Sequence, residues 1–310
     1  MKDKLKYLIV TFKGICMGAA DVIPGVSGGT IAFLMGIYQT LIDSIKAITT
    51  NFRLLLKGRF LAFLRAINAP FLCSLILGIL ISIFSLARLM GYLLVHHPIE
   101  LWSFFFGLIL LSSFMVLREI DKWNFTNILF LIIGIVVAGY ICLISPSQTP
   151  ETYWFIFLSG AIAICAMILP GISGSFILLL MGKYEFIMKA VTDLNLPVLI
   201  TFAIGAILGI LAFSHFLGWL LKKFYMPTIA ALSGFMIGSL IKVWPWKVVV
   251  AGSSENAALT VDRPVWPGHF EAANGVPAEL GGAIVFALVG IALVVILELS
   301  LKHKKSSETK

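Results

Sequence analysis

The sequence predicts an all-α integral membrane protein built from two inverted repeats, each a re-entrant helical hairpin followed by three transmembrane helices. Three observations lead to this fold: the composition, a motif that occurs twice, and the placing of the charged residues. Of the 310 residues, 60% are apolar and 12% are charged, and the mean hydropathy is +1.03. A soluble domain carries about 25% charged residues. The composition therefore excludes a water-soluble enzyme, a disordered protein and a nucleic-acid binder.

A Pro-Gly motif occurs twice and indicates an internal repeat. Residues 24–38 read PGVSGGTIAFLMGIY, and residues 170–184 read PGISGSFILLLMGKY. The match continues more weakly downstream, where the segment that begins at Arg88 aligns with the segment that begins at His215. An ordered series of matches at fixed positions favours duplication over chance. The two repeats that follow from this alignment are residues 1–148 and residues 149–310.

Two short arms flank the motif in each repeat. The apolar part of the arm after the motif is Ile31–Ile37 in the first repeat and Phe176–Gly182 in the second, and charged residues follow both. A helix of about seven residues covers only about 10 Å, whereas a full crossing needs about 20 residues. We therefore expect each pair of arms to form a re-entrant hairpin that enters and leaves the membrane on one face. The hairpins are residues 8–48 and residues 152–192.

Three apolar stretches follow each hairpin, and each is long enough to cross a membrane. A polar segment rich in Pro and Gly interrupts the second set, and we expect it to be an external loop. The expected spans are 70–95, 99–118 and 126–145 in the first repeat and 197–222, 226–246 and 281–301 in the second, and the loop is 248–280.

The number of crossings and the positive charges predict the same topology. A hairpin plus three spans makes an odd number of crossings, so the second repeat is inverted relative to the first. Cytoplasmic segments are enriched in Lys and Arg, which places the lysine-rich N-terminus and the 49–69 loop inside and the 93–100 and 145–152 loops outside. We expect a protein of the cytoplasmic membrane with both termini in the cytoplasm. The exceptions to the charge rule are Lys189, Lys242, Lys247 and Arg263.

The repeated motif breaks the helix within the membrane. The breaks lie at Pro24-Gly25 and Pro170-Gly171, and such breaks persist only inside protein or along a watery cavity. A helix that starts after the break points free N–H groups at it, and this arrangement is typical of a phosphate site. The alternative is a helix kink or close packing between helices. The Pro-Gly pairs are candidate gating positions, and the candidate phosphate-binding residues are Ser27, Gly28, Gly29, Thr30, Ser173, Gly174 and Ser175.

Asp21 precedes the first break inside an apolar arm, and the equivalent position of the second repeat is Met167. A carboxylate within the membrane is costly, so it is a candidate functional residue. Asp21 could carry a proton or bind a coupled cation. It could instead accept hydrogen bonds from the broken backbone and hold the motif in shape.

Arg88 and His215 occupy equivalent positions in long apolar stretches. The guanidinium of Arg88 suits a phosphate, although its side chain could also reach the interface. His215 could titrate, donate to phosphate or simply pack. Lys183 and Glu185 fall at a predicted interface, where we expect solvated or locally paired charges.

The four cysteines all lie in apolar stretches, and none forms a CxxC pair. A disulfide framework or a metal site is therefore not expected. We also expect no cofactor.

The stretch MGAADVIPGVSGGT at 17–30, together with LPGISGS at 169–175, resembles the bacterial PopT family of polyprenyl-phosphate translocases, formerly a domain-of-unknown-function family. The resemblance covers nearly the whole chain. It implies a transporter, not an enzyme, that returns undecaprenyl phosphate from the outer to the inner leaflet for reuse in cell-wall synthesis. The partners are then undecaprenyl phosphate and membrane lipid, with no nucleic acid. Moving a phosphate against an inside-negative potential is unfavourable, so we expect protons or another cation to move with it, through Asp21 or His215.

Two other functions compete with this interpretation. A small-anion or ion transporter could use the same architecture. A remote alternative is an intramembrane serine hydrolase, because Gly25-Val-Ser27-Gly28 fits a G-x-S-G pattern and His215 could act as its base. A lipid substrate predicts a side opening to the bilayer between the hairpin bundles, whereas a small ion predicts an enclosed aqueous path.

Overall fold

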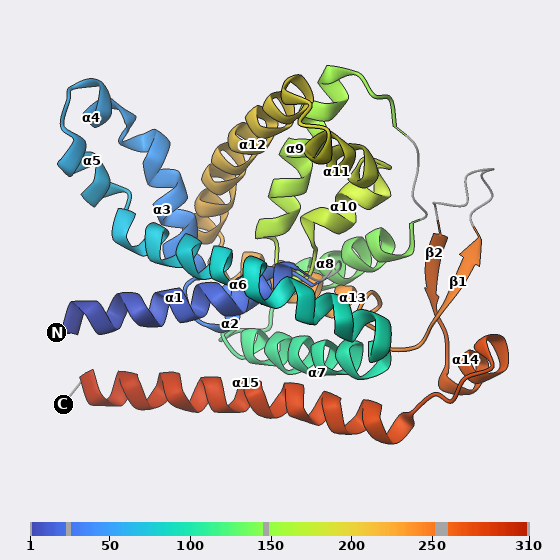
Figure 1. The fold of residues 1–310 in the computed structure, drawn as a ribbon. Helices are drawn as coiled ribbons and strands as arrows, with labels where there is room; N and C mark the ends of the chain where they lie inside the picture. The colour runs from blue at the N-terminus through green and yellow to red at the C-terminus, as the bar shows by residue number, and fades with distance from the viewer. Residues whose placement is uncertain (1, 23–25, 145–148, 252–259, 309–310) are drawn as a thin grey trace. The chain divides into compact units, whose positions relative to one another are not determined.

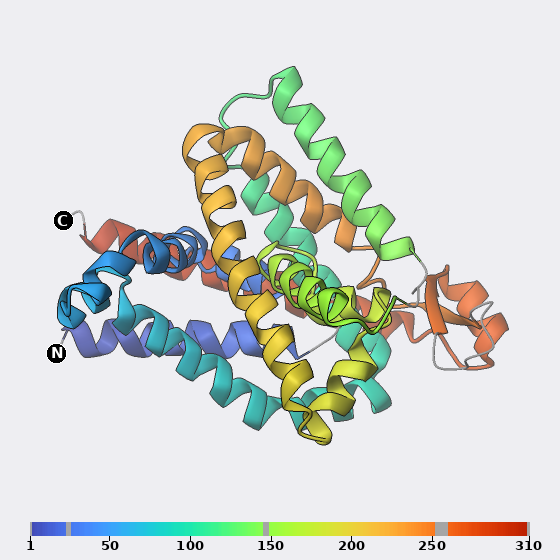
Figure 2. The ribbon, with the colours of Figure 1, turned by 90° about the horizontal axis from the view of Figure 1, so that it is seen from above.

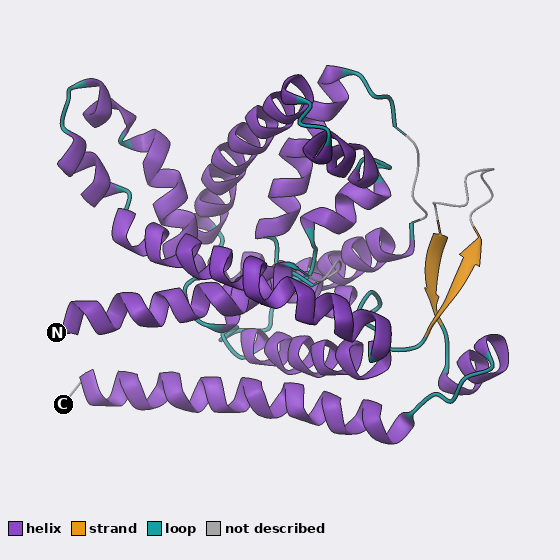
Figure 3. Ribbon diagram, in the orientation of Figure 1, coloured by secondary structure: helices purple, strands orange, loops and turns teal. Residues whose placement is uncertain are grey.

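The computed structural model describes residues 2–22, 26–144, 149–251 and 260–308. These residues are mostly helical, and they include two short strands (Figures 1 and 3). The chain forms two compact units, and each unit combines a segment from both halves of the sequence. Unit 1 is Met1–Met90 with Pro146–Ile229, and unit 2 is Gly91–Ser145 with Ala230–Lys310.

Unit 1 contains both Pro-Gly motifs, and the same order of helices surrounds each motif. A first-arm helix is followed by a helix of seven residues, a further short helix and a long helix. In the first half these are α1 (Lys2–Asp21), α2 (Gly28–Leu34), α3 (Tyr38–Thr50) and α6 (Ala69–His96), with α4 (Phe52–Leu56) and α5 (Phe60–Ala66) before α6. In the second half they are α9 (Tyr153–Ile168), α10 (Gly174–Leu180), α11 (Tyr184–Thr192) and α12 (Leu196–Lys223).

Unit 2 contains the end of α6 and most of α13 (Tyr225–Ser239). It also contains all of the remaining elements, which are α7 (Pro98–Leu117), α8 (Phe125–Leu143), β1 (Lys247–Ala251), β2 (Thr260–Pro264), α14 (Pro267–Asn274) and α15 (Leu280–Glu308). The strands pair antiparallel, with Lys247 opposite Pro264.

The prediction of a helical membrane protein is confirmed. Five described helices are long and apolar enough to cross a membrane, and the chain is a multi-pass membrane protein. These spans lie in α6, α7, α8, α12 and α15, where five of the six spans were expected. α2 and α3 also pass the same test together, but they are bent by 116°, which fits either a broken span or a re-entrant loop.

Two expectations for the last part of the chain need correction. The helix expected at 226–246 ends at Ser239, and its 15 residues are too few for a full crossing. Pro245 disfavours helical backbone in the residue before it, and β1 begins soon afterwards. The 248–280 segment, expected to be an external loop, contains most of β1, all of β2 and α14. The strands use the β-branched run Val248–Val250, and Pro267 starts α14 at a position where proline is favourable.

Glycines bring the long helices close together within each unit. In unit 1, Gly14 of α1 contacts Leu75 and Gly78 of α6, and one turn later Gly18 contacts Ile79. α1 and α6 therefore run in the same direction, inclined to each other, as Figures 1 and 2 show. Such close approach of backbones through small residues is typical of helices packed in a membrane.

The same packing recurs between α9 and α12, where Gly205 contacts Phe157 and Gly209 contacts Ala161. In unit 2, α7 packs on α15 through Gly107 and Gly290, and α8 packs on α13. The packing of α8 on α13 uses Gly134 and Gly234.

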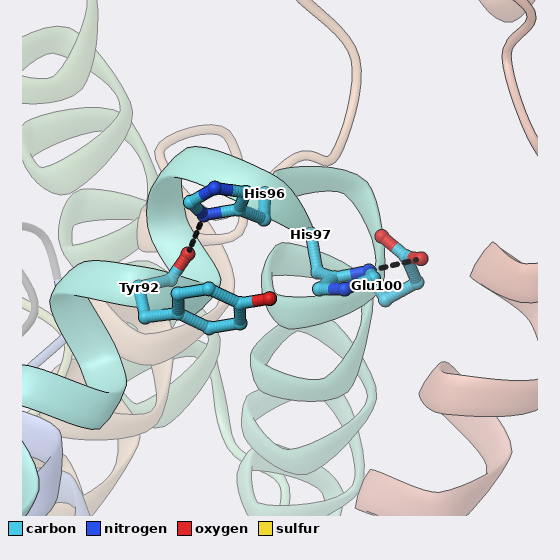
Figure 4. Close-up of polar contacts among 4 residues, drawn as sticks. All are labelled: Tyr92, His96, His97 and Glu100. Carbon is cyan, nitrogen blue, oxygen red and sulfur yellow. Dashed lines mark hydrogen bonds and ion pairs between the residues drawn. The ribbon is translucent and has the colours of Figure 1, made fainter.

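The connection between α6 and α7 is a tight turn. Pro98 occupies the first turn of α7, where its fixed φ favours the helix start. Tyr92 stacks on His96 with ring centroids 4.2 Å apart, and His97 Nδ1 lies 3.2 Å from Glu100 Oε1 (Figure 4). These exposed contacts close the turn at the expected boundary between two spans.

Candidate functional site

The two Pro-Gly motifs meet in unit 1 although they are far apart in the sequence. The Ser27 hydroxyl donates to the Leu169 carbonyl at 3.0 Å. The Gly171 N–H donates to the Thr30 hydroxyl oxygen at 2.8 Å. Two of the hydroxyls expected to bind phosphate therefore hold the motifs together. Pro24 and Gly25, expected as gating positions, lie outside the described residues.

Gly29 allows this approach because it has no side chain. A Cβ atom at this position would lie 2.5 Å from the Ile168 carbonyl oxygen. The carbonyl belongs to the last turn of α9, so the start of α2 touches the end of α9 directly. The Ser27 hydroxyl also lies 3.3 Å from the Met167 carbonyl oxygen, so among the described residues its acceptors at this crossing are backbone carbonyls of the other repeat.

The Thr30 contact can be tested without changing the size of the side chain. Thr30→Val removes the acceptor of the buried Gly171 N–H and should lower the free energy of unfolding by about 1–3 kcal/mol. Thr30→Ser keeps the hydroxyl and is the matched control. Thermal unfolding of both purified variants in detergent measures the difference, and equal stability of the two would show that the contact contributes nothing.

The N-terminus of α2 already has internal partners for its first N–H groups. Gly28 donates to Asp21 Oδ1 at 2.7 Å, Gly29 donates to the Ser27 hydroxyl oxygen at 3.1 Å, and Thr30 donates to the Ser27 carbonyl at 3.0 Å. Ser27 is thus the N-cap, and Asp21 closes the start of the helix. The hydrogen bond to Gly28 gives Asp21 a structural role in the broken backbone.

The second motif differs because Met167 stands where the first repeat has Asp21. The Ser173 and Ser175 hydroxyls lie 2.7 Å apart and bond to each other. Among the described residues, the N–H groups of Gly174 and Ser175 have no hydrogen-bond acceptor. The two helix starts therefore offer different chemistry: the first N–H groups of α2 have acceptors, whereas those of Gly174 and Ser175 have none in the described part of the chain.

The other carboxylate oxygen of Asp21, Oδ2, is buried and has no hydrogen-bond partner among the described residues. Asp21 lines an apolar cavity of about 400 Å³ inside unit 1. An ionised carboxylate in such surroundings is unfavourable unless a proton or a cation joins it. This environment allows the carrier role expected for Asp21 as well as its structural one.

Arg88 and His215 lie at matching places on α6 and α12. Arg88 follows Ser82, which contacts Gly18 of α1, by six residues or about 9 Å along the helix. His215 follows Gly209, which contacts Ala161 of α9, by the same number. Arg88 therefore lies beyond the glycine contact between α6 and α1, in the direction in which α1 ends. His215 lies at the same place relative to the contact between α12 and α9.

Neither Arg88 nor His215 forms a hydrogen bond with the described residues of the motifs. Arg88 is exposed and forms no hydrogen bond or ion pair with another described residue. His215 Nδ1 donates to the Leu211 carbonyl at 2.9 Å, and its Nε2 lies 3.1 Å from the Thr49 hydroxyl oxygen. His215 thus links α12 to the end of α3.

Lys183 is buried, and the expectation of a solvated or paired charge at this position is wrong. Its side chain is 1% exposed, its ammonium donates to the Thr149 carbonyl at 2.5 Å, and it lies 5.5 Å from the Phe186 ring centroid. The preceding Gly182 has a φ of 62°, which turns the chain sharply after α10 and directs Lys183 inward. Glu185, by contrast, is exposed as expected.

A lysine also lies at the corresponding end of α2. Lys13 donates to the Met35 carbonyl at 2.6 Å, and Thr149 donates to the equivalent Met181 carbonyl at 2.7 Å. Each seven-residue helix therefore has a donor at its C-terminal carbonyls. The sequence already marked Lys13 as unusual, because this lysine interrupts an apolar arm.

The buried Lys183 predicts a measurable loss of stability. Lys183→Met should lower the free energy of unfolding by about 1–3 kcal/mol, because the Thr149 carbonyl loses its partner. Lys189→Met is the control, since Lys189 is exposed on α11, the helix that begins directly after Lys183. Thermal unfolding that affects both variants equally would contradict this role.

The described residues contain no group of three or more His, Cys, Asp or Glu side chains that could hold a metal ion.

Comparison with known proteins gives consistent results. The sequence model of a family described as undecaprenyl phosphate translocase-like matches residues 17–261. A Vibrio cholerae protein named polyprenyl-phosphate transporter is 46% identical over 298 residues, which cover 95% of this chain and 97% of that protein. A Staphylococcus aureus protein of the same name is 35% identical over 251 residues, covering 75% and 84% of the two chains. Both are named as transporters and not as enzymes, and no solved structure matches the chain.

Proposed function

Because the chain belongs to the undecaprenyl phosphate translocase-like family, we propose that it returns undecaprenyl phosphate from the outer to the inner leaflet of the cytoplasmic membrane, so that cell-wall synthesis can reuse it. The observation that carries this proposal is the 46% identity, over nearly the whole chain, to a named polyprenyl-phosphate transporter. The broken helices that meet in unit 1 support it, because transporters place their substrate sites at such breaks.

The proposed head-group site uses the hydroxyl and N–H donors of both motifs. The second motif supports it most directly, because the N–H groups of Gly174 and Ser175 have no acceptor among the described residues. The donors at Ser27, Gly28, Gly29 and Thr30 would have to exchange their internal bonds for phosphate oxygens. Such an exchange would loosen the contact between the motifs, and it would couple substrate binding to movement of the hairpins.

The two halves of unit 1 support an inverted-repeat transporter. α1 packs parallel to α6 and α9 packs parallel to α12, and both pairs use glycine contacts at matching positions. In the proposed topology the two hairpins enter from opposite faces and both termini are cytoplasmic. Repeats inverted in this way can exchange an outward-open and an inward-open state around one site.

Transport in this direction requires coupling. The phosphate carries about −1.5 to −2 charges, and moving each charge against 100 mV costs about 2.3 kcal/mol. Two charges therefore oppose transport by about 4–5 kcal/mol at that potential, or about a thousandfold in concentration. We propose that protons or another cation move with the lipid, with Asp21 or His215 as the coupling residue.

The contacts of His215 allow two arrangements of its hydrogen bonds. Nδ1 faces a carbonyl and so must carry a hydrogen, whereas Nε2 faces a hydroxyl. Thr49 can donate to Nε2, or it can accept from Nε2 while donating to the Lys46 carbonyl at 3.1 Å. A proton at Nε2 therefore changes the direction of one hydrogen bond without breaking the link between α12 and α3.

The role of Arg88 predicts a specific defect. In proteoliposomes, Arg88→Ala should slow leaflet movement of a labelled polyprenyl phosphate at least tenfold, because the phosphate loses a permanent positive partner. Arg65→Ala is the control, since Arg65 is exposed in the segment before α6. Normal movement with Arg88→Ala would exclude Arg88 from the site, and absence of movement with folded wild-type protein would contradict the proposed function.

A further inference from the structure

The cavity in unit 1 is lined by helices from both hairpins. Its walls come from α1, α2 and α3, from α9, and from the long helices α6 and α12. The volume of about 400 Å³ lies within the range of about 300–1,000 Å³ typical of small-molecule sites. Gly29, at the crossing of the two motifs, forms part of the wall. The cavity therefore adjoins the proposed head-group site.

The walls are apolar and reach the surface of the unit. Among the described residues that line the cavity, Asp21 alone has a polar side chain, and the others are Ile, Leu, Met and Gly. Ile76 of α6 is 51% exposed, and Ile207 of α12 is 56% exposed. Both helices contain candidate membrane spans. The lining thus continues onto surfaces that face hydrocarbon in a membrane.

We propose that this cavity holds the part of the isoprenoid chain next to the phosphate, an inference that rests on the proposed function. The phosphate itself does not suit the cavity. The described residues that line it include no Lys, Arg or His, and Asp21 would face the anion in apolar surroundings. The isoprenoid chain is uncharged, so it needs no basic partner and is not repelled by Asp21. It can enter from the bilayer past Ile76 and Ile207.

Packing gives the cavity its selectivity. Lipid tails are as apolar as leucine, so a chain gains little free energy merely by leaving the bilayer. A prenyl chain has methyl branches and rigid double bonds, and a rigid ligand that fits a formed cavity loses less conformational freedom than a flexible one. The cavity should therefore favour prenyl phosphates over phosphatidic acid, which has a similar phosphate group on two flexible acyl chains.

Photochemical labelling of the wild-type protein tests this inference directly. The probe is farnesyl phosphate with a diazirine in its first isoprene unit, added to proteoliposomes that contain the full chain. Labels should appear at cavity residues such as Ile79 and Ile210, and excess undecaprenyl phosphate should suppress them at least tenfold. Labels outside the cavity, or equal suppression by phosphatidic acid, would overturn the inference.

A matched pair of variants provides a second test. Ile210→Trp fills the cavity and should reduce both labelling and lipid movement at least tenfold. Leu208→Trp is the control, because Leu208 is 52% exposed on the same helix and does not line the cavity. Normal movement with a folded Ile210→Trp variant would overturn the inference and leave the proposed function intact. If the wild-type protein neither transports nor binds a prenyl phosphate, the proposed function itself is wrong.

Discussion

Asp21→Asn is expected to remain folded but to lose most of its transport and all of its response to a pH gradient. Asparagine keeps a side-chain oxygen that can accept the hydrogen bond from Gly28, now 2.7 Å from Asp21 Oδ1. It cannot bind or release a proton at the position of Oδ2, which is buried without a partner at an apolar cavity. The substitution thus separates the structural role of Asp21 from its proposed role as carrier.

The measurement is leaflet movement of labelled polyprenyl phosphate in proteoliposomes, with and without an imposed pH gradient. Wild-type movement should accelerate when the gradient drives protons along with the lipid, and the Asp21→Asn rate should be at least tenfold lower and independent of the gradient. Asp43→Asn is the control, because Asp43 is exposed and bonds to Gln39. Asp21→Ala should in addition lower stability by about 1–3 kcal/mol, because the buried Gly28 N–H loses its acceptor. An Asp21→Asn variant with a normal gradient response would rule out Asp21 as the coupling residue.

Gly29→Ala is expected to disrupt the crossing of the two motifs and abolish transport. The added methyl group would lie 2.5 Å from the Ile168 carbonyl oxygen, a backbone atom that cannot rotate away. Either α2 or the end of α9 must therefore shift, and the Ser27 and Thr30 hydrogen bonds across the crossing would be strained or lost. The expected result is a clear fall in melting temperature and a loss of lipid movement.

Gly91→Ala is the matched control, because a Cβ atom at Gly91 would meet nothing within 4 Å. Alanine has a higher helix propensity than glycine by about 1 kcal/mol, so this variant should be at least as stable as the wild type. Thermal unfolding in detergent and lipid movement should be measured for both variants. Equal melting temperatures for Gly29→Ala and Gly91→Ala would contradict the close contact at Gly29.

The sequence predicted the short helices after the motifs because their limits are visible in the pattern. The apolar runs after each motif are brief, and each ends at a glycine that adopts a positive φ, 67° at Gly36 and 62° at Gly182. Most long spans were also predictable, since continuous apolar stretches of this length have few other uses. The limits of α13 were not, because its apolar stretch continues past the point where the helix ends at Ser239.

The site itself was only partly predictable. The sequence identified Asp21, Ser27 and Thr30 as unusual polar residues in an apolar context. Their actual partners are Gly28, the Leu169 carbonyl and the Gly171 N–H. The last two partners come from the other motif, and no local pattern indicates which hydroxyl faces which backbone group. The burial of Lys183 also depends on a tertiary contact, here with Thr149. The division into repeats and the phosphate-binding roles stay predictions.

The most direct test of the central claim compares three phosphates in the same proteoliposomes. Movement of labelled undecaprenyl phosphate, phosphatidic acid and inorganic phosphate should be measured with the wild-type protein and with protein-free vesicles. The proposed function predicts protein-dependent movement of undecaprenyl phosphate, little movement of phosphatidic acid and none of inorganic phosphate. Protein-dependent flux of inorganic phosphate without movement of the lipid would contradict it and would favour a small-anion transporter.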